Sequence, residues 1–480
     1  MDTRVLVPLE TVTVEAPPTP VSFVPTPTAT YRQHRKAVKL TVEPGRPTNV
    51  EQPPVPLPYA FGARVLIWKQ DPSVEEIGTR KAFLHGIVLE GPRDARIASG
   101  APGIAPVSPN AFGDFVMTPG TPQFDAVHTF AVVRQTLTMY QRALAATGSD
   151  SPIPWYWNSE ENTDPLQIYP YGLSNVMNAY YSRHENCLKF GDFVPTGSKS
   201  RVYTCRSFDI VAHETAHAVL DGLKPNWLLA DQPPQTGALH EAFGDLTAIF
   251  LTLSQLDQCE AVIAQTKARM HDKTFLADIA EQFGLALGRP NGLRNADNDI
   301  TMEEAGTEVH GLSQVFTGAV YDILADAFHQ EREPDRHDDA AVLHRVGEYL
   351  KGLVLRALMQ APDEHATFAD VANAMLQLAR EDGKAEDYLG FIRQRFVVRG
   401  VLAEPAPDAD PGAALAPGVQ DAPGAVQDRR ACCGTMNLAE YYQLDNVLDE
   451  ELRALQRWCA ANRRTPPAPP EPPPEWPEPV

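Results

Sequence analysis

Apolar residues recur every three to four positions along several long stretches of this chain, with polar residues between them. This is the spacing of one buried face of an α-helix. It predicts helices over residues 123–146, 208–220, 237–253, 343–360, 368–379 and 388–399. The side chain of Thr367 can accept a hydrogen bond from the first turn of the helix that follows it, so we expect Thr367 to cap that helix.

Shorter apolar runs in the first half of the chain have a different pattern. Residues 64–68 and 82–89 are rich in β-branched and aromatic residues, which favours strands, and they predict a small β unit over residues 61–110. Residues 151–206 are expected to be rich in strands and loops. Because strands come first and helices follow, the pattern predicts an α+β fold.

Both ends of the chain lack this patterning. Residues 1–60 are rich in proline and are expected to be extended. Residues 403–436 are predicted to be a flexible linker, residues 437–464 have helical periodicity, and residues 465–480 form a Pro-rich tail. We expect these ends either to be solvated or to bind the rest of the chain or a partner protein.

The charge of the chain narrows the range of its partners. The 480 residues carry a net charge of −21, which disfavours nucleic acid and anionic membranes as partners. No apolar run is long enough to span a membrane, and the N-terminal residues lack the pattern of a signal peptide. The six cysteines show no spacing typical of a disulfide framework. We therefore expect a reduced, cytoplasmic location.

One motif in the predicted helix at 208–220 carries chemistry. His213 and His217 are four residues apart, so their imidazoles lie on one helix face and can reach one zinc ion at about 2.0–2.1 Å. Glu214 follows the first histidine, where its carboxylate can take a proton from a water on the same metal. Such a short motif also arises by chance in a chain with 13 histidines, so a further ligand is needed to decide.

The next predicted helix offers that ligand. Glu241 and Asp245 lie four residues apart on a strongly apolar helix, and burying two acids is costly unless something neutralises them. A zinc ion bound by His213, His217 and Glu241 would neutralise them and keep one coordination position for water. Asp245 would then accept a hydrogen bond from a ligand histidine. The alternative is that both acids face solvent.

Together, H-E-x-x-H at residues 213–217 and E-x-x-x-D at residues 241–245 resemble the gluzincin metallopeptidases, and specifically the thermolysin family. The resemblance covers about residues 110–400. It implies a two-lobed fold, in which a β-rich lobe over residues 111–222 ends in the zinc-binding helix and a mainly α-helical lobe spans residues 223–402. It also implies Zn²⁺ as the cofactor and a peptide or protein as the substrate.

Further positions match this family in the expected order. Asn178 and Ala179 resemble the family's edge-strand segment, which pairs with an extended substrate. Arg294 resembles the arginine that bonds the substrate carbonyl beyond the scissile bond. His310 resembles the late histidine that stabilises the oxyanion. The resemblance therefore implies substrate binding by the first three residues and a catalytic role for the fourth.

The chain also departs from the family pattern. The aspartate that orients the late histidine is replaced by Ala305, so Glu303, Glu304 or Glu308 would have to take its place. The residues after the second zinc helix lack the family's calcium-binding acids, and we expect no calcium site although Asp209 remains. No clear counterpart of the tyrosine that assists the oxyanion is present between the two zinc helices.

The sequence thus predicts a zinc-dependent peptidase in which Glu214 is the general base and His310 assists the oxyanion. The lack of an amine-binding motif of the type G-x-M-E-N favours an endopeptidase. Two other interpretations remain open. One is a catalytically inactive gluzincin fold that holds zinc and binds peptides or partner proteins; the other is an interaction protein whose ends carry the function.

Overall fold

The described part of the chain is an α+β fold built on one mixed sheet. The computed structural model describes residues 62–100, 104–149, 151–195, 198–229 and 231–404. All of them belong to one of the two compact units of the chain, Val55–Val480. The predicted N-terminal segment 1–60, the linker beyond residue 404, the helical segment 437–464 and the tail 465–480 lie outside the described residues.

The main sheet contains five strands in the order β3-β4-β6-β5, with β7 paired to β6. Its strands are β3 (Ile97–Ser99), β4 (Leu166–Leu173), β5 (Ala179–Ser182), β6 (Cys187–Phe193) and β7 (Val202–Tyr203). β4 is parallel to β3 and β6, whereas β5 and β7 are antiparallel to β6. β5 therefore lies at an edge of the sheet, and the prediction of strands within residues 151–206 is confirmed.

Two small sheets accompany the main one. β1 (Ala63–Trp68) pairs with β2 (Thr79–Leu84), and β8 (Asp278–Ile279) pairs with β9 (Arg294–Asn295). The strand predicted at residues 64–68 is confirmed. The strand predicted at residues 82–89 is wrong in its extent, because Gly86 has a positive φ of 84° and turns the chain out of the strand.

Helices make up most of the second half of the described chain. They are α2 (Pro122–Ala146), the short 3₁₀ helix Thr204–Arg206, α3 (Phe208–Leu223), α4 (Pro234–Leu253), α5 (Leu256–Thr266), α6 (Glu281–Ala286), α7 (Met302–Ala305), α8 (Val309–Glu331), α9 (Asp339–Gln360), α10 (Phe368–Glu381) and α11 (Glu386–Val398). Each predicted helix is confirmed with small shifts at its ends. The Thr367 hydroxyl accepts a hydrogen bond from the Asp370 amide at 3.2 Å, which confirms the predicted cap.

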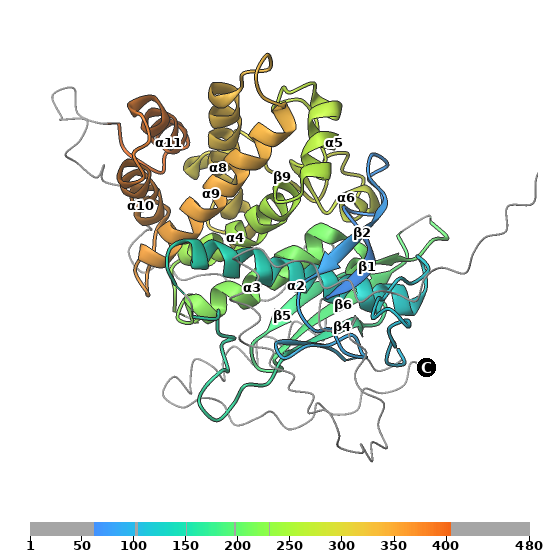
Figure 1. Ribbon diagram of the computed structural model, residues 1–480. Helices are drawn as coiled ribbons and strands as arrows, with labels where there is room; N and C mark the ends of the chain where they lie inside the picture. Colours follow the sequence, from blue (N-terminus) through green and yellow to red (C-terminus); the bar gives the residue numbers. More distant parts are fainter. Residues whose placement is uncertain (1–61, 101–103, 150, 196–197, 230, 405–480) are drawn as a thin grey trace, which may run out of the picture. The chain divides into compact units, whose positions relative to one another are not determined.

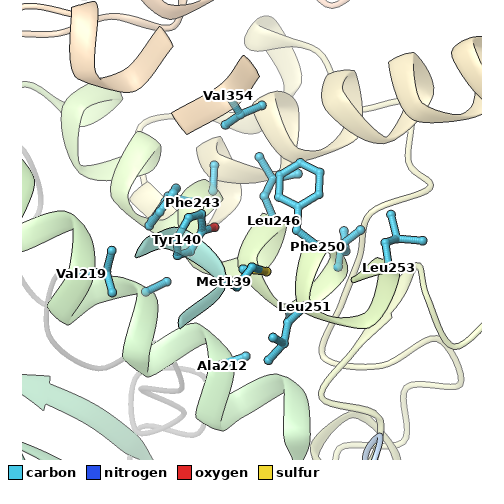
Figure 2. Close-up of a cluster of buried hydrophobic side chains, with 14 of the residues drawn as sticks. Met139, Tyr140, Ala212, Val219, Phe243, Leu246, Phe250, Leu251, Leu253 and Val354 are labelled. Atoms are coloured by element: carbon cyan, nitrogen blue, oxygen red, sulfur yellow. The ribbon is translucent and has the colours of Figure 1, made fainter. Parts of the chain in front are cut away.

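The helices α3 and α4 lie in the core of this arrangement. α2 and α3 pack against the sheet, and α4 packs on α3 (Figure 1). α4 also contacts α8, α9 and α10, and all of its residues are buried. Figure 2 shows apolar side chains at this junction, where Tyr140 of α2 stacks on Phe243 of α4 with ring centroids 4.9 Å apart. The predicted metal ligands thus sit on two rigidly packed helices.

Two observations bear on the expected location of the protein. Within the part of the chain that the structure describes, no helix combines the length and apolar character needed to cross a membrane. The described cysteines, Cys187, Cys205 and Cys259, are buried and unpaired. The cytoplasmic location itself stays a prediction.

Candidate metal centre

Helix α3 brings together the two histidines of the H-E-x-x-H motif. The Ser207 hydroxyl caps this helix by accepting a hydrogen bond from the Ile210 amide, and both imidazoles are buried. The Nε2 atoms of His213 and His217 are 3.0 Å apart. Glu214, between them in sequence, is completely buried on the same helix. One turn of helix therefore presents two imidazole nitrogens at a single point.

Helix α4 adds the third side chain. The Glu241 carboxylate lies 3.4 Å from His213 Nε2 and 3.6 Å from His217 Nε2. The ligand atoms of the three residues all lie within 4.8 Å of one another. Tetrahedral ligands at 2.0–2.1 Å from zinc are about 3.3–3.4 Å from each other. The distances in the structure are close to these values, so the three side chains fit such a metal.

A glycine allows α4 to approach α3 this closely. A Cβ atom at Gly244 would lie 2.4–2.6 Å from three ring atoms of His213, which is shorter than any real contact of that kind. The hydrogen atom of glycine leaves this space to the imidazole. Glu241 and Asp245, one turn apart on α4, can then both contact the ring of His213.

Asp245 and Arg294 hold the other ring nitrogen of His213. Asp245 Oδ1 lies 2.8 Å from His213 Nδ1, and Arg294 donates two hydrogen bonds to the Asp245 carboxylate at 2.8 and 2.5 Å. Burial would raise the pKa of Asp245, but Arg294 and His213 lower it below its usual range. The ionised Asp245 accepts the Nδ1 proton of His213, which leaves the Nε2 lone pair to a metal.

The proton balance of His213 is linked to metal binding. Burial would lower the pKa of His213, but its hydrogen bonds to Asp245 and Glu241 raise it to about 9. A metal ion that binds at Nε2 must therefore displace a proton.

His240 holds the second ligand histidine. The Nδ1 atoms of His217 and His240 are 2.7 Å apart, and the two rings stack with centroids 4.9 Å apart. Burial, together with the charges of Arg183 and His213, lowers the pKa of His240 to about 3. His240 is therefore neutral, and its Nδ1 can accept the Nδ1 proton of His217. His240 was not among the site residues predicted from the sequence, where its only signal is its position directly before Glu241.

His310 lies beside the same group at the start of α8. Its Nε2 is 3.4 Å from Glu241 Oε2, and its Nδ1 is 2.8 Å from Glu308 Oε1. The Glu308 carboxylate also caps α8 by accepting hydrogen bonds from two backbone amides. Of the three glutamates considered as its orienting group, the structure places Glu308 on His310, whereas Glu304 caps α7 together with Thr301.

Asn178 and Ala179 lie at the start of the edge strand β5, which contacts α3. The Asn178 carbonyl accepts a hydrogen bond from the Gly191 amide of β6 at 2.9 Å, so the backbone groups of Ala179 point away from β6. There the Ala179 amide donates to Asn178 Oδ1 at 2.9 Å. Within the described sheet, β5 pairs only with β6. The Ala179 carbonyl therefore points to the edge of β5 that has no partner strand among the described residues.

Comparisons with known proteins find similarity to solved structures. No protein-family model matches the chain, and no curated protein matches its sequence. Among solved structures, the precursor of protealysin, a metalloproteinase from Serratia proteamaculans, is similar with 15% sequence identity and a TM-score of 0.41. The similarity covers 64% of this chain and 86% of that one. With similarity this low, a function for this chain must be argued from its own side chains.

Proposed function

We propose that this chain is a zinc-dependent metallopeptidase. The observation that carries the proposal is the convergence of the Nε2 atoms of His213 and His217 with the Glu241 carboxylate at distances that suit zinc. Two nitrogens and one carboxylate are a ligand set of catalytic zinc sites, which keep a further position for water or substrate. Asp245 and His240 support this assignment, because each keeps a proton on Nδ1 of one ligand and leaves its Nε2 to the metal.

In this proposal, each neighbouring residue has a separate role in peptide hydrolysis. Zinc, when bound, lowers the pKa of water towards about 7 and polarises the scissile carbonyl. Glu214 takes the proton of the attacking water and passes it to the leaving amine. His310 donates from Nε2 to the developing oxyanion, while Glu308 holds its Nδ1.

The substrate is a peptide or protein that lies extended along β5. The backbone of Ala179, which points away from β6, supports pairing with an extended chain, and Asn178 directly precedes it. Pairing of an extended peptide along a strand edge favours an endopeptidase. Arg294 donates a hydrogen bond to Asp245. We propose that it also contacts the substrate carbonyl beyond the scissile bond.

The proposal includes a two-lobed, thermolysin-like arrangement. Strands β4 to β7 fall within residues 111–222, where the β-rich lobe is expected, and α4 to α11 fall within residues 223–402. α3, which carries both histidines, ends at Leu223, where the two lobes would meet. The predicted unit 61–110 contributes β3 to the main sheet, because β3 pairs with β4.

The test compares the wild-type chain with Glu214→Gln on a peptide library read by mass spectrometry, with zinc measured in each sample. Glu303→Gln, which changes an exposed glutamate of α7, is the matched control. We expect one zinc per chain in all three proteins. Cleavage should be equal in wild type and control, and about a hundred- to ten-thousandfold slower in Glu214→Gln.

Other outcomes separate the alternatives. Equal cleavage by Glu214→Gln would remove Glu214 as the base. Zinc in all samples with cleavage in none would instead support a zinc-containing protein that binds peptides without cutting them. A chain purified without chelator that holds no zinc would overturn the metal site and favour an interaction protein.

A further inference from the structure

A second site lies away from the metal centre. An open cavity of about 340 Å³ is lined by residues of α2, β2, α9 and the C-terminal end of α4, and α2 contacts each of the other three elements. This volume falls at the lower end of the range for small-molecule sites, which is about 300–1,000 Å³. None of the residues of the metal centre lines it. The cavity therefore needs an explanation of its own.

The walls of this cavity are rich in basic side chains. Its basic lining residues are His85, Arg134, Arg142, His344 and Lys351, and its acidic lining residue is Glu348. The chain as a whole has a net charge of −21, so this surplus of basic groups runs against its composition. Such a local field concentrates anions.

Two of the three permanent cations in the cavity already have acidic partners. Arg134 pairs with Asp94 at 2.8 Å, and Lys351 pairs with Glu348. No acidic side chain among the described residues forms an ion pair with Arg142, which is exposed on α2. The surplus of one positive charge thus belongs to the guanidinium of Arg142.

The neighbours of Arg142 respond to this charge. Burial lowers the pKa of Lys351 although Glu348 raises it, and the charge of Arg142 adds a smaller lowering effect. Burial also lowers the pKa of His85, again with contributions from Arg142 and Arg134. Burial is the larger cause of both shifts, and the contribution of Arg142 to each shows that its charge lies close to both side chains.

The rest of the lining is partly polar, and among its apolar residues Phe83 is 46% exposed. Leu84, Met139 and Leu251 line the cavity and are nearly completely buried. Figure 2 shows Met139 and Leu251 within the cluster of buried side chains between α2 and α4. Because these three side chains leave little surface for contact, a ligand with an apolar part would bury that part against the exposed ring of Phe83.

We propose that this cavity binds a small organic monocarboxylate, whose carboxylate contacts Arg142 and whose apolar part contacts Phe83. A guanidinium presents paired donors that match the two oxygens of a carboxylate. The surplus of one charge suits a monoanion, because a dianion would leave an uncompensated negative charge beside buried groups. The volume suits a compact ligand.

Isothermal titration calorimetry of the full-length, zinc-loaded chain tests this site. The probes are phenylacetate and phenylacetamide, which have the same shape and differ in charge. Arg142→Gln removes the proposed contact, and Arg345→Gln is the matched control, since Arg345 is an exposed arginine on α9 outside the cavity. A circular dichroism spectrum checks that both variants fold.

We expect saturable binding of phenylacetate to wild type and to Arg345→Gln. Binding should be about tenfold weaker or more for phenylacetamide and for Arg142→Gln, as for the loss of one charged hydrogen-bonding partner. A carboxylate that binds at the metal instead would be unaffected by Arg142→Gln. Equal affinity in that variant, equal affinity for the amide, or no saturable binding would each overturn the site.

Discussion

The two imidazoles of the metal centre are held by chemically different partners. Asp245, ionised and paired with Arg294, contacts His213, whereas neutral His240 contacts His217. A carboxylate attracts the Nδ1 proton more strongly than a neutral imidazole does and so makes the opposite nitrogen more basic. Both partners have the same effect on geometry, because each fixes the ring so that its Nε2 faces Glu241.

Replacing His240 should weaken zinc binding without removing a ligand. His240→Leu removes the His240 acceptor of the Nδ1 proton of His217, and loss of such a partner typically weakens metal affinity about 10- to 100-fold. His240→Asn keeps a carbonyl acceptor and should recover most of the affinity. Competition with a chromophoric chelator measures both. If His240→Leu bound zinc as tightly as wild type, another group would have to orient His217.

Glu308→Gln should move the pH profile of peptide cleavage. Burial would lower the pKa of His310, but Glu241 and Glu308 raise it. If protonated His310 is the donor to the oxyanion, as proposed, activity is present below this pKa and is lost as pH rises through it. Removing the charge of Glu308 lowers the pKa, so the alkaline limb should shift to lower pH.

Kinetics separate this effect from a loss of zinc or of fold. For Glu308→Gln we expect kcat at neutral pH to fall about tenfold or more, while KM and zinc content stay near wild type. Glu303→Gln, on the exposed surface of α7, should leave the profile unchanged. An unmoved alkaline limb in Glu308→Gln would mean that Glu308 does not tune His310.

At the scale of single residues, the sequence predicted best the pairs of side chains that are brought together by spacing within one helix. His213 with His217, and Glu241 with Asp245, are pairs at i and i+4, and helix geometry alone brings their side chains to one face. The contact between His217 and His240 joins two helices, so no spacing along the chain could reveal it. For the same reason the sequence alone could not decide whether Glu303, Glu304 or Glu308 is the partner of His310.

At the scale of elements, the site depends on how closely α4 approaches α3. Gly244→Ala should therefore perturb two properties together. Its Cβ would meet the His213 ring at 2.4–2.6 Å, so the ring or the helix must shift. We expect a loss of about 1–3 kcal/mol in the free energy of unfolding and weaker zinc binding. Urea unfolding and zinc titration measure these.

A second glycine provides the control. Gly352 lies within α9, and a Cβ there would meet no atom within 4 Å. Gly352→Ala should stabilise the chain by about 0.5–1 kcal/mol, since alanine loses less conformational freedom in a helix, and it should leave zinc binding unchanged. If Gly244→Ala behaved in the same way, the close approach of the helices would not matter to the site.

The elements differed in how well the sequence predicted them. Long helices such as α2 and α9 were recovered, because their apolar face repeats over many turns. The two-residue strands β8 and β9 have no period to detect, since they exist only through pairing with each other. β9 begins at Arg294, so the position of this residue against Asp245 is a tertiary property.

At the scale of the whole described fold, three acids from distant segments meet in the interior. Asp71 follows β1, Asp209 lies in the first turn of α3, and Glu281 begins α6, and all three are buried. Burial raises the pKa of each, and their mutual repulsion raises the pKa of Asp209 and Glu281 further. Both carboxylate oxygens of Glu281 lack a hydrogen bond among the described residues. The folded state therefore favours protonated carboxyls here.

This cluster should make the fold less stable as pH rises. Since the folded pKa values of these carboxyls exceed their unfolded values near 4, their stabilisation is complete below that pH and is lost as pH rises towards the folded values. Asp209→Asn removes one charge and keeps an acceptor for the Ala280 amide. In calcium-free buffer, urea unfolding should show this variant more stable than wild type at pH 8 and nearly equal at pH 4.

Asp114→Asn should behave in the opposite way, because Arg64 holds the pKa of Asp114 below its usual value. A uniform loss of stability in Asp209→Asn at every pH would show that Asp209 is ionised in the fold and held by a cation.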